Sequence, residues 1–144
     1  MKVNSSLIAA AIAASGLAFT ANAIAAPMSH LPATHTQGDV SYLSGGIGQS
    51  EAAAMKHIAR RYPLELEFVL KAKPKAEYLA DVKVNIKDAH DKVVLDTTAG
   101  GPFLLAKMPA GKYTVSADRD GKVEHRQVEI AANAHRRVIF EWKS

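Results

Sequence analysis

The chain has 144 residues, a formal net charge of +4 at pH 7 and no cysteine. This length suits one domain, and the lack of cysteine excludes a disulfide framework, a thiolate metal site and a cysteine nucleophile. Positive and negative residues are mixed along the chain, and Arg60-Arg61 and Arg136-Arg137 are only pairs. The modest positive charge therefore does not indicate nucleic-acid binding.

Residues 1–23 have the pattern of a cleavable secretory signal peptide. Lys2 supplies a positive charge, the apolar run from Leu7 to Phe19 is too short to span a bilayer, and Ala21-Asn22-Ala23 fits the A-x-A cleavage rule. We expect cleavage near Ala23, with a cut after Ala25 as a close alternative. The mature protein is expected to be periplasmic or secreted and to lack a transmembrane segment; a retained N-terminal anchor is the disfavoured alternative.

Residues 24–48 are expected to form a flexible N-terminal arm. The stretch up to Gly38 is rich in Ala, Pro, Ser, Thr and His and shows no periodicity. Within the arm, Val40 to Leu43 is either a short strand or an extended lead-in. The segment Gly45-Gly46-Ile47-Gly48 lacks the endings of phosphate-binding and dinucleotide-binding loops and predicts a flexible joint.

Residues 49–62 predict the single helix of the mature chain. Ser50 is a suitable N-cap, Glu51 places a negative charge in the first turn, and Pro63 ends the helix. Ser50 is also a candidate ligand contact, because helix N-termini attract anions. One face carries apolar residues at helical spacing, namely Ala52, Met55, Ile58, Ala59 and Tyr62.

Residues 63–143 have the alternating pattern of β-strands. Seven strands at short, regular spacing predict an antiparallel sandwich or barrel. The expected strands are Leu64–Lys71, Ala80–Lys87, Val93–Leu95, Phe103–Leu105, Tyr113–Asp118, a strand ending at Ile130, and Val138–Trp142.

Two turns organise this β-rich segment. Pro109 and Gly111 suit the second and fourth positions of a type I turn and predict a hairpin that leads into the strand beginning near Tyr113. Asp120-Gly121 is a strong type I′ signal for the next hairpin. Trp142 falls on the buried side of the last strand. Structural roles are therefore expected for Pro109, Gly111, Tyr113, Gly121 and Trp142.

The segment GPFLLAKMPAGKYTVSA, preceded by YLADVKVNIKDAHDKVVLD, resembles a carboxypeptidase regulatory-like domain. The proline–glycine turn before Tyr-Thr-Val is the commonest signature of such domains, and the resemblance covers residues 42–142. With GGIG and a helix upstream, the chain is similar to a group of secreted proteobacterial proteins. The resemblance implies a transthyretin-like, seven-stranded antiparallel sandwich and a docking or matrix-like module without catalysis. Asp91 stands where the family often has glycine; Asp tolerates left-handed angles better than most residues, so this turn should be kept.

Histidine and serine residues are the candidates for chemistry. His90 shares a turn with Asp88 and Asp91, which is the best local cluster for weak metal binding, although it has neither HExxH nor zinc-finger spacing. Across the second hairpin His125 should approach either Ser116 or Thr114, but a flat strand surface offers no oxyanion pocket. We therefore expect neither a cofactor nor an enzyme.

The expected function is a non-catalytic secreted or periplasmic interaction module whose partner is a protein or another component of the cell envelope. Sheet-edge pairing is the simplest route for such a partner. The alternative is a protein that binds a small ligand such as a carbohydrate, an anion or a metal. Tyr42 and Tyr78 are the only aromatics expected to be partly exposed, which is a thin basis for a sugar site.

Overall fold

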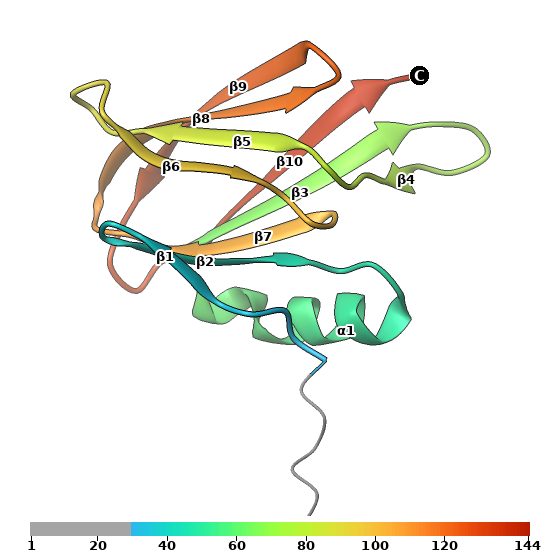
Figure 1. Cartoon of the computed structure of the whole chain (residues 1–144), viewed down its shortest axis with the longest axis horizontal. Helices are drawn as coiled ribbons and strands as arrows, with labels where there is room; N and C mark the ends of the chain where they lie inside the picture. Colours follow the sequence, from blue (N-terminus) through green and yellow to red (C-terminus); the bar gives the residue numbers. More distant parts are fainter. Residues whose placement is uncertain (1–29) are drawn as a thin grey trace, which may run out of the picture.

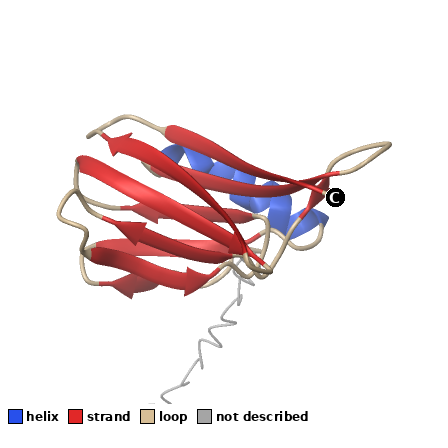
Figure 2. Ribbon diagram, turned by 90° about the horizontal axis from the view of Figure 1, so that it is seen from above, coloured by secondary structure: helices blue, strands red, loops and turns tan. Residues whose placement is uncertain are grey.

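The computed structural model describes residues 30–144, so the expected signal peptide at 1–23 lies outside the described part of the chain. Two β-sheets face one another, and a helix lies on the outer side of the larger sheet (Figure 1). Strands dominate the structure (Figure 2), which agrees with an all-β fold and is consistent with a sandwich. Within residues 30–144, no helix is long and apolar enough to cross a membrane.

The large sheet has six strands in the order β1-β2-β7-β3-β10, with β4 beside β3, and the small sheet has the order β6-β5-β8-β9. α1 (Gln49–Ile58) and the short 3-10 helix η1 (Ala59–Arg61) connect β2 to β3. The strands are β1 (His35–Gln37), β2 (Val40–Gly45), β3 (Leu64–Lys71), β4 (Glu77–Tyr78), β5 (Lys83–Lys87), β6 (Val93–Thr98), β7 (Phe103–Lys107), β8 (Gly111–Arg119), β9 (Lys122–Ile130) and β10 (Arg136–Lys143).

The strand count and the strand directions differ from expectation. Residues 30–144 form ten strands rather than seven, because β1, β2 and β4 join the seven that were expected. The large sheet is mixed rather than antiparallel, since β10 runs parallel to β3 over its whole length. After β9 in the small sheet the chain crosses to the large one, where the Arg136 N–H donates to the Pro63 carbonyl (2.8 Å) and sets this parallel register.

The turn at Pro109 to Gly111 does not close a hairpin, which corrects the prediction. β7 belongs to the large sheet and β8 to the small sheet, so the turn carries the chain between the two layers. The Tyr113 hydroxyl donates to the Pro109 carbonyl (2.7 Å) and fixes this crossing. A strand–turn–strand sequence looks the same whether its strands pair or change sheets. The hairpin at Asp120-Gly121 does join β8 to β9, with both turn residues at positive φ.

The arm expected at 24–48 does not extend through residues 35–45, which form two strands joined by a turn. β1 pairs with β2, and β2 lies beside β7 within the large sheet. Val40 and Tyr42 face the small sheet, whereas Leu43 faces α1, and all three are buried. A strand that is covered on both sides loses the polar alternation by which half-buried strands are recognised.

Two apolar clusters hold the layers together. The larger cluster fills the space between the sheets and includes Phe68, Phe140 and Trp142, so the predicted burial of Trp142 is confirmed. The smaller cluster joins α1 to the outer side of the large sheet. The predicted apolar face of the helix is also confirmed, since this smaller cluster contains Met55 and Ala59 and has Ala52, Ile58 and Tyr62 packed against it.

The glycine-rich segment before α1 is a packed joint. Gly48, rather than Ser50, is the N-cap, and no side chain caps the helix. Instead, the Glu51 carboxylate turns back and accepts a hydrogen bond from the Gly46 N–H (2.8 Å). A Cβ built on Gly101 would lie 2.4 Å from the carbonyl carbon and oxygen of Gly45. The two backbones can approach this closely because residue 101 is a glycine, whereas a Cβ on Gly45 would instead meet the Glu51 carboxylate and Pro32.

One side of the two-layered structure is closed by a side chain. The Gln37 amide donates to the Asp96 carbonyl (2.9 Å) and accepts from the Asp96 N–H (3.0 Å). Gln37 lies on β1 at the rim of the large sheet, and Asp96 lies on β6 at the rim of the small sheet. The amide thereby occupies backbone groups of β6 that would otherwise be open to another strand.

Candidate functional site

A cleft of about 510 Å³ separates α1 from the strands β3 and β10. Its walls come from the helical segment, from β3 soon after it, from β7 and from the start of β10. The helical side, the β7 strand and the β3–β10 side contribute Lys56, Ala59, Arg60, Glu65, Phe103, His135 and Arg137.

Two buried carboxylates lie at the β3 side of this cleft. The alternation along β3 directs Leu64, Leu66 and Phe68 toward the small sheet, so Glu65 and Glu67 point toward the helix side. Only 6% of Glu65 and 5% of Glu67 is exposed. A buried carboxylate needs a charged or hydrogen-bonding partner, and the two partners come from the start of β10 and from the residue just before it.

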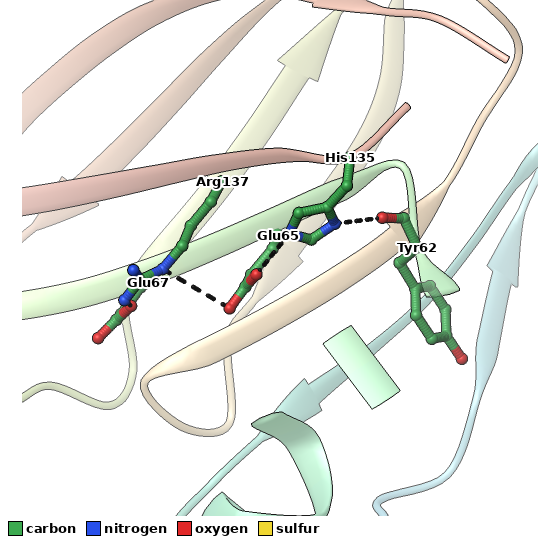
Figure 3. Close-up of polar contacts among 5 residues, drawn as sticks. All are labelled: Tyr62, Glu65, Glu67, His135 and Arg137. Atoms are coloured by element: carbon green, nitrogen blue, oxygen red, sulfur yellow. Dashed lines mark hydrogen bonds and ion pairs between the residues drawn. The ribbon is translucent and has the colours of Figure 1, made fainter. Parts of the chain in front are cut away.

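His135 joins the first carboxylate to the end of the helical segment (Figure 3). Its Nε2 lies 2.8 Å from Oε2 of Glu65, and its Nδ1 lies 2.7 Å from the carbonyl oxygen of Tyr62. A carbonyl and a carboxylate are both acceptors, so only the imidazolium form donates to both at once. These two contacts tie the residue just before β10 to the segment that follows α1.

Arg137 holds the second carboxylate. Its Nη2 lies 2.5 Å from Oε2 of Glu67, and its Nε lies 3.8 Å from Oε1 of Glu65 (Figure 3). The hydrogen bond with Glu67 raises the pKa of Arg137 above its usual value, with the charge of the same carboxylate as the next cause. The two acids are therefore already paired with His135, just before β10, and with Arg137 on β10.

The rim of the cleft carries two further cations. Lys56 Nζ lies 5.5 Å from the ring centre of Tyr78 and 5.7 Å from that of Phe103, within range of cation–π attraction. Arg60 is exposed on η1. Among residues 30–144, neither Lys56 nor Arg60 has a carboxylate oxygen within 4.0 Å. The rim is consequently positive and has charge to offer a ligand.

Sequence reasoning missed this site for a specific reason. Glu65 and His135 are 70 positions apart and meet only because β10 runs parallel to β3. The register places Arg137 directly beside Glu65 on the neighbouring strand. The available signal was a pair of acids alternating with leucines on one strand, together with basic residues at the start of another.

The two tyrosines proposed as exposed binding residues, Tyr42 and Tyr78, differ in exposure. Tyr42 is buried, with 6% exposed, and its hydroxyl donates to the Thr97 hydroxyl (3.3 Å), so the expected exposure of Tyr42 is wrong. Tyr78 is 52% exposed, as expected, and its ring lies 5.4 Å from that of Phe103. Ser50 is exposed in the first turn of α1, and the described structure gives it no capping role.

In the turn from Asp88 to Lys92, the Asp88 carboxylate accepts hydrogen bonds from the backbone of the turn itself. Asp88 Oδ1 accepts hydrogen bonds from the N–H groups of His90 (2.8 Å) and Lys92 (3.0 Å). Asp91 has a φ of 60°, so it takes the left-handed conformation that the sequence predicted. Groups of three or more potential metal ligands are absent from residues 30–144, and His90, Asp88 and Asp91 do not form one.

The Asp88 turn should respond to acid. The hydrogen bond from the Lys92 N–H, followed by that from His90, lowers the pKa of Asp88 below 3.8. A carboxyl whose pKa is lowered in the folded state stabilises the turn above its unfolded pKa, and this contribution is lost as the pH falls through the folded value. An NMR titration should show the amide signals of His90 and Lys92 moving with a midpoint below 3.8.

Asp88→Asn provides the control for this titration. The asparagine oxygen still accepts both hydrogen bonds but does not titrate. The two amide signals should therefore keep their positions at neutral pH and lose their acid response. A midpoint at or above the ordinary value in the unsubstituted protein would contradict the prediction.

The serine–histidine pair anticipated across the second hairpin does form. Ser116 Oγ lies 2.8 Å from His125 Nδ1, and the two residues are direct partners in the β8–β9 register. Both side chains lie on the outer side of the small sheet. The nearby Asp118 carboxylate accepts a hydrogen bond from the Gly121 N–H (2.8 Å). No carboxylate orients the imidazole within the part of the chain described, so the pair lacks the third member of a catalytic triad.

Comparison with known proteins adds no family to this picture. No protein-family model matches the chain, and no curated protein matches it. Fold and site together define an all-β domain with a positively rimmed cleft between its helix and its large sheet.

Proposed function

We propose that this protein is a non-catalytic binding module of the cell envelope, secreted or periplasmic, and that it holds an acidic partner in the cleft between α1 and β10. We further propose that it belongs to the carboxypeptidase regulatory-like class with a transthyretin-like fold. The signal-peptide pattern of residues 1–23 supports the location. The signature turn before Tyr113 and the two facing sheets support the class.

The observation that carries the proposal is the charged face beneath the helix. A sheet face covered by a helix is normally apolar, as it is where Leu43 and Leu105 meet Met55. Beside them, Glu65 and Glu67 replace apolar residues although a buried ion pair seldom stabilises more than well-packed hydrophobic side chains do. Local rules of folding are broken most often where a protein needs the residues for another purpose.

The charge balance of the cleft selects the chemistry of the partner. Arg137 lies against both Glu67 and Glu65, and His135 bonds to Glu65, so the two carboxylates repel an incoming acid only weakly. Lys56 and Arg60 remain for the ligand. A carboxylate-bearing surface or peptide would gain charge-assisted hydrogen bonds from both cations without displacing an existing pair.

A small anion is the second candidate ligand. The same two cations could hold phosphate, and Tyr78 beside Lys56 offers the one predicted sugar platform that is exposed. The Asp88 carboxylate already accepts two backbone hydrogen bonds, which makes the turn at His90 a poor metal site. An acidic macromolecule is favoured over a small anion because the cations lie along an open rim.

The test is a binding titration of the mature protein with a fluorescent decaglutamate peptide, with a decalysine peptide and inorganic phosphate as comparison ligands. Lys56→Gln/Arg60→Gln should weaken decaglutamate binding by about tenfold or more, whereas Lys83→Gln/Lys87→Gln removes the same charge from the small sheet and should have little effect. Equal losses in the two double variants, or no binding of decaglutamate at low salt, would refute the proposal. Binding of phosphate alone would favour the small-anion alternative.

A further inference from the structure

The four outer strands of the two sheets differ in how well their edges are protected. β1 has three residues, and the backbone of Asp96 on β6 is occupied by Gln37. β9 directs the charged side chain of Arg126 inward, over the Phe140 ring at 5.4 Å, and inward charges are a common way to block an edge. β10 has eight residues, and no strand within residues 30–144 pairs with its outer edge.

The backbone of β10 presents a regular set of open groups at that edge. The Arg136 N–H donates to the Pro63 carbonyl on the β3 side. Backbone polar groups alternate in direction along a strand, so Val138 and Phe140 also face β3. Arg137, Ile139 and Glu141 consequently direct their N–H and carbonyl groups away from the sheet.

We propose that β10 pairs antiparallel with β10 of a second copy of this chain, across a two-fold axis at Ile139. The two copies of Ile139 would exchange both backbone hydrogen bonds, and Arg137 of each copy would lie opposite Glu141 of the other. The two large sheets would then continue into one another, with both α1 helices on the same side.

Side-chain chemistry favours this occupant over an unrelated strand. Ile139 is 43% exposed although it is large and apolar, and it lies at the centre of the edge. The side chains of Arg137 and Glu141 lie two residues on either side of Ile139 and are 54% and 50% exposed, although Arg137 already contacts Glu67 and Glu141 lies 3.9 Å from Lys71. The exposed part of each would add a contact with the other copy. An edge protected against self-association would carry like charges at these positions; opposite charges make self-pairing complementary.

The register of the pairing is fixed by the same residues. A shift by one residue would turn Ile139 toward the opposite face of its partner and would place Arg137 beside no acid. Arg137 borders both the cleft and the edge, but Lys56 and Arg60, which would hold the ligand, lie on the helical side and take no part in the edge. The dimer can therefore be tested without a ligand.

The first test is the mass of the mature protein in solution, measured by analytical ultracentrifugation over a range of concentrations. We expect a reversible dimer whose dissociation constant rises at least about tenfold in Ile139→Arg, since two arginines would meet at the axis. Val123→Arg is the matched control, because Val123 is 46% exposed on β9, and it should leave the dimer unchanged.

The second test uses the lack of cysteine in the chain. In an antiparallel hydrogen-bonded pair the Cα atoms are about 5.5 Å apart, which is within the range of a disulfide. Ile139→Cys should therefore form a disulfide-linked dimer under mild oxidation at least about tenfold faster than Val123→Cys. A monomer at every concentration, a dimer unaffected by Ile139→Arg, or equal cross-linking of the two cysteine variants would overturn the proposal.

Discussion

Gly101→Ala should destabilise the protein by about 3 kcal/mol, at the upper end of the usual cost of overpacking. The added methyl group would lie 2.4 Å from the carbonyl carbon and oxygen of Gly45 and 2.8 Å from its Cα. These are backbone atoms of β2, so no flexible side chain can move aside. Urea unfolding of the mature protein, followed by circular dichroism, measures the loss.

The neighbouring glycine provides a matched control. A Cβ on Gly100 would meet its nearest atom, Ser44 Oγ, at 3.8 Å, which is ordinary van der Waals contact. Gly100→Ala should therefore change the free energy of unfolding by no more than about 0.5 kcal/mol. If both variants were equally stable, the close approach of residues 45 and 101 would not exist in solution.

Arg137→Ala should cost about 2–3 kcal/mol of stability, because it leaves the buried Glu67 carboxylate without its charged partner. The expected value lies below that of a fully buried pair, since half of the Arg137 side chain is exposed and water can enter when it is removed. The free energy of unfolding from urea titration, taken at one low protein concentration, gives the result.

A double variant distinguishes the cost of leaving Glu67 unpaired from the cost of losing the packing of Arg137. Glu67→Leu/Arg137→Met replaces both charges with apolar groups of similar size and leaves no unpaired acid. It should be at least about 1 kcal/mol more stable than Arg137→Ala. A double variant as unstable as the single one would mean that packing, rather than the stranded charge of Glu67, accounts for the loss.

The sequence predicts those elements in which apolar and polar residues alternate with a regular period. Leu64, Leu66 and Phe68 alternate with polar residues, and β3 is found where the alternation places it. The helix lies within one residue of its expected start, because its apolar stripe and Pro63 are local signals. β2 was ambiguous since it is covered on both faces, and the crossing at Pro109 resembled a hairpin because a turn does not record which strands pair afterwards.

The candidate site was predictable only where its partners are close in sequence. Ser116 and His125 flank a recognisable turn, so their contact follows from the hairpin register. Glu65 and His135 depend on a parallel pairing between strands that lie far apart along the chain. Neither residue looks unusual alone, and periodicity reports which side of a strand is apolar rather than which distant strand lies beside it.

The amide of Gln37 has a consequence for proteolytic processing. It is the first side chain in the described structure that bonds to the small sheet, and β1 contributes only two residues before it. Proteolytic removal of the residues before His35 would leave Gln37 in place, and β1 would still be bonded to β6. A cut beyond Gln37 would instead expose β2 and β6 together, and their open backbone groups would favour pairing with strands of other chains.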